Sequence, residues 1–163
     1  MTLTATAAPN IFVDADACPV KEEVYKVARR CGCPVHVVAN NFIRTPPGVQ
    51  LVVVDAGADM ADDWIAEHIA PGDIVITNDI PLADRSLKAG GLALGASGKP
   101  FTQASIGAAL AQRELMEHLR SFGEITGGPK PFSQADRSRF LSALDAAVHK
   151  ARALKQPPPE PRS

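Results

Sequence analysis

Acidic residues stand directly after three separate apolar runs of this sequence, and their types and spacing could support metal-dependent chemistry. They are Asp14 and Asp16, then Asp55 and Asp59, then Asp79. Asp62 and Asp63 follow Asp59 by three and four residues, so a helix would place them on its face. Grouped carboxylates bind hard cations such as magnesium or manganese, which can activate water and stabilise charge on a phosphodiester. The pattern therefore predicts a magnesium or manganese site.

Basic residues avoid the same part of the chain. Between Arg44 and Arg85 there is no Lys or Arg, whereas this interval contains eight acids. Carboxylates that converge without a nearby side-chain cation repel one another. A divalent cation would relieve that repulsion, which favours the metal interpretation.

Helix capping is the alternative role for these aspartates. Asp is a preferred N-cap residue, and Asp16, Asp59 and Asp79 each precede a segment with a helical pattern. Capping explains any one of them as well as metal binding does. It is their joint placement after three apolar runs that favours a shared site.

Apolar runs and helical patterns alternate along the chain and must position these acids. The runs predict strands at 10–14, 34–40, 50–55, 73–77 and 92–94, and helices at about 19–31, 59–69, 81–89, 102–121 and 134–154. This alternation predicts one α/β domain over residues 10–154, with a central, mainly parallel sheet flanked by helices. We expect the ends, 1–9 and 155–163, to be disordered. In such sheets, sites form at the carboxyl ends of strands, where the acids would meet.

Several polar residues are predicted to accompany the acids. Asn40 and Arg44 follow the second strand, and the Arg44 guanidinium is suited to gripping a phosphate. Thr77 and Asn78 end the fourth strand, where they could orient a water or a phosphate oxygen, or cap the next helix. At a later helix start, Ser133 and Asp136 match a variant of the capping box.

Net charge, cysteine content and the lengths of the apolar runs narrow the range of possible functions and locations. The 163 residues carry a formal net charge of −1, so any binding of nucleic acid must depend on local patches. The three cysteines, Cys18, Cys31 and Cys33, are predicted to be reduced thiols. We find no secretory signal and no apolar run near the roughly 20 residues of a membrane span, which predicts a cytoplasmic protein without a membrane partner. The Gly/Pro-rich segment 123–133 is predicted to be an ordered loop within the domain, and residues 126–131 inside it a mobile flap or a plain connector.

A strand ending in Asp-x-Asp is also typical of haloacid-dehalogenase-like phosphatases. Asp14 would then be the nucleophile and Asp16 the acid/base, with Asp79 and Asp84 as the later acidic pair. That mechanism also needs a Lys ahead of the second pair. The lack of basic residues between 44 and 85 argues against it.

Five stretches, taken in order, resemble the YaiI/YqxD family of bacterial proteins. They are VDADACPVKEE, VANN with IRTPPGV, GADMADDWI, GDIVITNDIPLAD and TGGPKPFSQADR. The resemblance runs from about Ile11 to Phe140 and implies a PIN-like fold, in which acids at the carboxyl edge of a parallel sheet bind magnesium or manganese. By position, the acidic motifs of the family fall on Asp14, Asp16, Asp59, Asp62 and Asp79.

These lines together predict a divalent-metal-dependent nuclease that acts on RNA. The predicted metal ligands are Asp14, Asp59, Asp62 and Asp79, supported by Asp16 and Glu22, and Arg44 would steady the phosphate. Two alternatives stay open: the phosphatase, and a non-catalytic RNA- or nucleotide-binding module that retains an acidic pocket.

Overall fold

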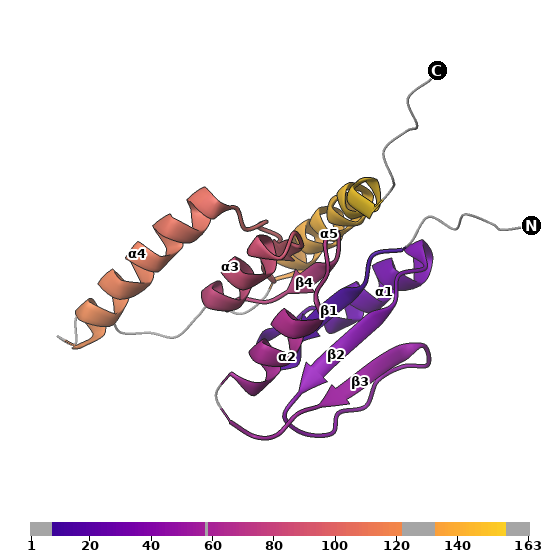
Figure 1. Ribbon diagram of the computed structural model, residues 1–163. Coiled ribbons are helices and arrows are strands. Elements are labelled where there is room, and N and C mark those ends of the chain that lie inside the picture. Colours follow the sequence, from indigo (N-terminus) through magenta and orange to yellow (C-terminus); the bar gives the residue numbers. More distant parts are fainter. Residues whose placement is uncertain (1–7, 58, 122–132, 156–163) are drawn as a thin grey trace, which may run out of the picture.

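The computed structural model describes residues 8–57, 59–121 and 133–155. At its centre is a five-stranded sheet, and Figure 1 shows helices packed around it. The strands are β1 (Ile11–Asp14), β2 (Val35–Ala39), β3 (Val49–Val53), β4 (Ile74–Ile76) and β5 (Leu92–Leu94). Their order is β3-β2-β1-β4-β5, and every pairing between them is parallel. The prediction of one α/β domain around a parallel sheet is confirmed, and β1 lies at the centre of the sheet.

Helices cover both faces of this sheet. They are α1 (Lys21–Cys31), α2 (Met60–His68), α3 (Ile80–Lys88) and α5 (Gln134–Lys155), whereas α4 (Gln103–Ser121) contacts α3 and extends away from the sheet in Figure 1. Ile11 and Val13 pack in the core formed with α1 and α5, whereas Phe12 packs in the core formed with α2 and α3. Because side chains alternate along a strand, Asp14 belongs to the same face as Phe12. The last residue of β1 is thus directed toward the α2 and α3 side.

The residues after β1 form a short turn before α1 begins. Residues Ala15–Ala17 make one turn of 3-10 helix, and α1 starts at Lys21 after Val20, which provides no side-chain cap. The alternative role of Asp16 as a helix cap is therefore wrong. The predicted end of α1 is confirmed, because Gly32 adopts a φ of 72°, a left-handed conformation that Gly reaches without steric cost.

A buried acid joins the opposite, amino edge of the sheet to the last helix. Asp73 is 1% exposed, accepts hydrogen bonds from the backbone N–H groups of Asn10 and Ala70 at 3.0 Å, and pairs with Lys155 at 2.8 Å. These contacts tie the starts of β1 and β4 to the end of α5. Asp73 is one of the eight acids between Arg44 and Arg85, but these contacts give it a structural role.

Other predictions can be compared with the structure directly. The capping box at the start of α5 is confirmed, since Ser133 Oγ accepts from the Asp136 N–H at 3.1 Å and Asp136 Oδ2 accepts from the Ser133 N–H at 3.0 Å. The three cysteines are free thiols. Within the described residues, no helix is both long and apolar enough to cross a membrane. The predicted flap at 126–131 and the outer parts of both predicted disordered ends, 1–7 and 156–163, lie outside the described residues.

Candidate functional site

Asp14 and Thr77 form the centre of the candidate site, at the carboxyl ends of the adjacent strands β1 and β4. Thr77 Oγ1 donates a hydrogen bond to Asp14 Oδ2 at 3.0 Å, and both side chains are buried. Burial raises the pKa of Asp14, the Thr77 bond opposes that rise, and the charges of Asp16 and Asp79 add to it. Thr77 therefore helps to keep a buried acid in its charged form.

Asp79 is held beside this pair by two hydrogen bonds. Its backbone N–H donates to Thr77 Oγ1 at 3.0 Å, and its Oδ1 accepts from the Leu82 N–H at 3.0 Å. The second bond is an N-cap of α3, so capping is confirmed for Asp79. Capping uses one carboxylate oxygen and leaves the other to face the site.

Asp62 comes to the same region from α2. Burial raises the pKa of Asp62 to about 7, helped by the charges of Asp79 and Asp14, a hydrogen bond with Asp79 and the charge of Asp59. An interaction of this kind requires the carboxyl groups to lie near one another. The structure thus brings together Asp14, Asp62 and Asp79, with Asp59 at the margin.

Asp59 precedes α2 with a φ of 72°, a left-handed conformation that Asp tolerates better than most residues. Its side chain makes no capping hydrogen bond, so the capping alternative is wrong here as well. The side chain is exposed and contributes negative charge to Asp62. This conformation turns the chain into α2 and so helps to place Asp62.

Asp16 lies at the outer rim of the same edge. Its Oδ2 accepts a hydrogen bond from Asn40 Nδ2 at 3.3 Å, which links the turn after β1 to the end of β2. Asn40 Oδ1 is buried and has no hydrogen-bond partner among the described residues. Asp16 and Asn40 therefore both lie at the carboxyl edge, as predicted, and the Asn40 Oδ1 atom is available there as an acceptor.

Other predicted residues lie elsewhere or have structural roles. Asn78 Oδ1 accepts a hydrogen bond from the Ala96 N–H at 3.0 Å, which fixes the turn after β5. Asp63 pairs with Arg85 at 2.8 Å, and Asp84 pairs with Lys88 at 2.9 Å, both at the surface. Two of the eight acids between Arg44 and Arg85 are therefore neutralised by surface salt bridges and do not belong to the site.

Glu22 and Arg44 do not join the acids on the α2 side. They line a hollow on the α1 side of the sheet, together with residues of α5. The prediction that Glu22 supports the carboxylates is not borne out by its position. Lys26 and Arg29, which sequence reasoning missed, line the same hollow, and their i, i+3 spacing on a predicted helix was the available signal.

The donor chemistry of the acidic site suits a hard divalent cation, although the site is not a preformed cage. Carboxylates from β1, α2 and the start of α3 converge there, and the Asn40 oxygen lacks a partner at the rim. Within the part of the chain that the structure describes, no three Asp, Glu, His or Cys side chains lie close enough together to hold a metal ion. Cation binding would therefore require side-chain adjustment that breaks the hydrogen bond between Asp62 and Asp79.

Comparisons with known proteins give one consistent family. The family model described as "Uncharacterized BCR, YaiI/YqxD family" matches residues 12–150. A "UPF0178 protein" of Caulobacter sp. (strain K31) is 65% identical over 144 residues, covering 87% of this chain and 95% of the relative. A "UPF0178 protein" of Rhodopseudomonas palustris (strain BisB5) is 55% identical over 159 residues, covering 96% and 97%. No solved structure gives a significant match.

Proposed function

We propose that this chain, which belongs to the YaiI/YqxD family, is a PIN-like, divalent-metal-dependent phosphodiesterase that cleaves RNA. One observation carries the proposal: carboxylates from three separate elements converge at the carboxyl edge of a parallel sheet, where burial, and next to it the charges of Asp79 and Asp14, raise the pKa of Asp62 to about 7. Structural acids are usually paired or solvated, whereas these are gathered against one another. Such an arrangement favours a role in binding positive charge.

The proposed ligands are Asp14, Asp62 and Asp79, with Asp59 at the margin and Asp16 at the rim. A divalent cation bound there would supply an activated water and would offset charge on the phosphate. Thr77 orients Asp14 and holds its charge, since its hydroxyl already donates to Oδ2. Asp62 would release its proton as it takes up a ligand position, because a cation favours the charged carboxylate.

The rival phosphatase finds less support in the arrangement of the acids. It needs Asp84 in a second acidic pair, but Asp84 lies on α3 and pairs with Lys88 at the surface. It also needs Asp14 as an accessible nucleophile, and Asp14 is only 7% exposed with Oδ2 engaged by Thr77. We therefore favour Asp14 as a metal ligand.

Calorimetric titration of metal-free protein with manganese tests the proposal directly. We expect saturable binding in the wild type and at least tenfold weaker binding in Asp14→Asn and in Asp79→Asn, the loss of a charged oxygen ligand being roughly that large or larger. Asp63→Asn is the matched control, because Asp63 neighbours Asp62 in sequence but pairs with Arg85 at the surface. Its manganese affinity should equal that of the wild type.

Cleavage of a labelled single-stranded RNA with manganese is the second half of the test. Asp14→Asn should abolish cleavage, while Asp63→Asn should retain it. Unchanged cleavage in both Asp14→Asn and Asp79→Asn would overturn the proposal. Trapping of a beryllium fluoride adduct on Asp14 would favour the phosphatase, and salt-sensitive RNA binding without turnover would favour a non-catalytic module.

A further inference from the structure

A basic groove lies on the opposite face of the sheet from the acidic site. It has a volume of about 850 Å³ and is bounded by α1, the start of α5 and the segment that joins β2 to β3. Five cationic side chains line it against two carboxylates, although the whole chain carries a net charge of −1. The cations are Lys21, Lys26, Arg29, Arg44 and Arg137. Positive charge is thus concentrated in one hollow of a protein whose other residues together carry a net negative charge.

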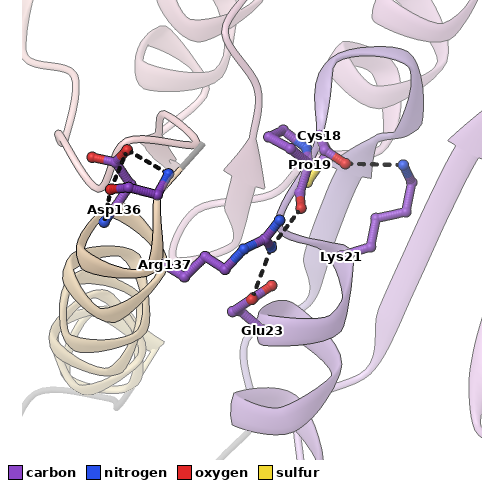
Figure 2. Close-up of polar contacts among 7 residues, drawn as sticks. Cys18, Pro19, Lys21, Glu23, Asp136 and Arg137 are labelled. Atoms are coloured by element: carbon purple, nitrogen blue, oxygen red, sulfur yellow. Dashed lines mark hydrogen bonds and ion pairs between the residues drawn. The ribbon is translucent and has the colours of Figure 1, made fainter. Parts of the chain in front are cut away.

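The two walls of this basic groove are fastened to each other. Figure 2 shows Arg137 extending from α5 to α1, where Nη1 donates to the Pro19 carbonyl at 3.1 Å and to Glu23 Oε1 at 3.0 Å. In the same view, Lys21 Nζ donates to the Cys18 carbonyl at 3.0 Å. The bond to Arg137 neutralises Glu23, so Glu22 is the acid of the groove that lacks a cation partner among the described residues. The groove is therefore rigid at this end and retains a positive excess.

Three cations of the basic groove are available to a ligand. Lys26, Arg29 and Arg44 are exposed, and none of them forms a salt bridge with a described residue. Lys26 and Arg29 are three residues apart on α1, so they project from the same side of the helix. Arg44 faces them from the β2–β3 segment. An extended polyanion fits this spread of charges better than a single phosphate does.

An exposed aromatic ring stands close to these cations in sequence. Phe42 is 80% exposed and precedes Arg44 by two residues on the β2–β3 segment. An exposed Phe on the same segment as an unpaired Arg is typical of surfaces that bind single-stranded nucleic acid, because unpaired bases stack on aromatic rings while phosphates contact Lys and Arg. A duplex would not offer its bases to such a ring.

The basic groove and the acidic site meet at the carboxyl edge of the sheet. Lys21 of the groove donates a hydrogen bond to the Cys18 carbonyl, and the charge of Asp14 reaches the Cys18 thiol, so Cys18 lies near both. Asp16 and Asn40, which are hydrogen-bonded to each other, occupy the rim where the β2–β3 segment begins. A chain lying in the groove can therefore continue over this rim toward the acids.

We infer that the basic groove between α1, α5 and the β2–β3 segment binds the phosphate backbone of a single-stranded nucleic acid, with Phe42 stacked on a base, and presents the strand to the acidic site. The inference rests on the proposed function for its biological meaning. Its physical content, binding in the groove, can be measured without catalysis.

Fluorescence anisotropy with a labelled single-stranded RNA of about 12 nucleotides, in EDTA, measures binding alone. We expect the double variant Lys26→Glu/Arg29→Glu to bind at least about tenfold more weakly, and each single variant to reduce the salt slope by about 0.7 to 1. Phe42→Ala should weaken binding about fivefold or more, through lost stacking. Lys150→Glu is the matched control, because Lys150 is an exposed lysine that does not line the groove.

The outcomes separate the inference from the proposed function. The inference would be overturned if the groove variants bound RNA with wild-type affinity, or if Lys150→Glu lost as much RNA affinity as they do. Either result counts whatever the cleavage assay shows. Equal affinity for a duplex of the same length would overturn the stacking role of Phe42. Asp63→Asn, a substitution outside both the groove and the acidic site, should bind RNA as the wild type does in EDTA. Groove binding with no cleavage under any metal would overturn the nuclease and leave the inference about the groove standing.

Discussion

Thr77 Oγ1 donates a hydrogen bond to Asp14 Oδ2 at 3.0 Å, and the same hydroxyl oxygen accepts from the Asp79 N–H at 3.0 Å. One threonine thus connects two acids that are 65 residues apart in the sequence, at the ends of two adjacent parallel strands. It fixes the spacing between them and stabilises the charge on the buried one. The site depends on this hydroxyl as much as on its carboxylates.

Thr77→Val keeps the shape of the side chain and removes the hydroxyl. We expect the free energy of unfolding to fall by about 1–3 kcal/mol, because the part-buried Asp79 N–H loses its acceptor and the buried Asp14 carboxylate loses its donor. Manganese affinity should fall as well, since the pKa of Asp14 rises further without the Thr77 bond. Urea denaturation and calorimetry measure the two effects.

Thr45→Val provides the matched control for that variant. Thr45 Oγ1 donates to the Val49 carbonyl at 3.5 Å, at the long limit for a hydrogen bond. We expect a change within about 0.5 kcal/mol and unchanged manganese affinity. Equal effects of the two substitutions would contradict a special role for Thr77.

Asp62 gives the metal-free protein a characteristic pH dependence. Its pKa is about 7 in the folded state against an ordinary value of 3.8, so between these values the folded protein holds a proton that the unfolded chain has released. The free energy of unfolding should therefore fall as pH rises through this window and level off above pH 7. Asp62→Asn removes that titration, so its melting temperature should exceed that of the wild type more at pH 8 than at pH 5.

Asp63→Asn separates this effect from a general loss of negative charge. Asp63 is the next residue of α2, but it is exposed and pairs with Arg85. Thermal denaturation from pH 4 to 9 should show the wild-type slope in this variant. If the melting temperatures of Asp62→Asn and Asp63→Asn changed with pH in the same way, the raised pKa of Asp62 would be contradicted.

The buried pair of Asp73 and Lys155 should dominate the stability of the amino edge of the sheet. Asp73→Asn should cost about 3–5 kcal/mol, because it leaves the Lys155 ammonium, on a side chain only 14% exposed, without its partner. Asp84→Asn, which breaks the exposed pair with Lys88, should change stability by less than about 1 kcal/mol. Urea denaturation of the two variants compares them, and similar losses would contradict the difference in burial.

Much of the framework follows from local sequence patterns. The apolar runs became the five parallel strands, and the helical pattern predicted at about 19–31 became α1, with Gly32 at its end. The N-cap at Asp79 and the capping box at Ser133 were also predictable. These features depend on residues within one or two turns of each other, so the sequence records them directly.

The sequence identified only some of the residues that form the acidic site. Sequence spacing marked Asp14, Asp62 and Asp79, which the fold does bring together. It did not separate them from Asp63, Asp73 and Asp84, each of which the fold pairs with a basic side chain. Nor did it separate Glu22 from the acids, although α1 places Glu22 across the sheet from them. Choosing among acids requires knowing which distant cation each one meets.

The sequence by itself determined the alternation of strands and helices, and with it the edge of the sheet at which the acids would lie, because periodicity and strand ends are local properties. The tertiary structure alone decided which face of the sheet each side chain occupies and which partners it contacts. The face depends on the alternation of side chains along β1, and the partners come from segments more than 60 residues away in the chain. It also assembled the basic groove from three separated segments, α1, the β2–β3 segment and α5. Their cations are distant in the chain and become neighbours only when the two walls pack together.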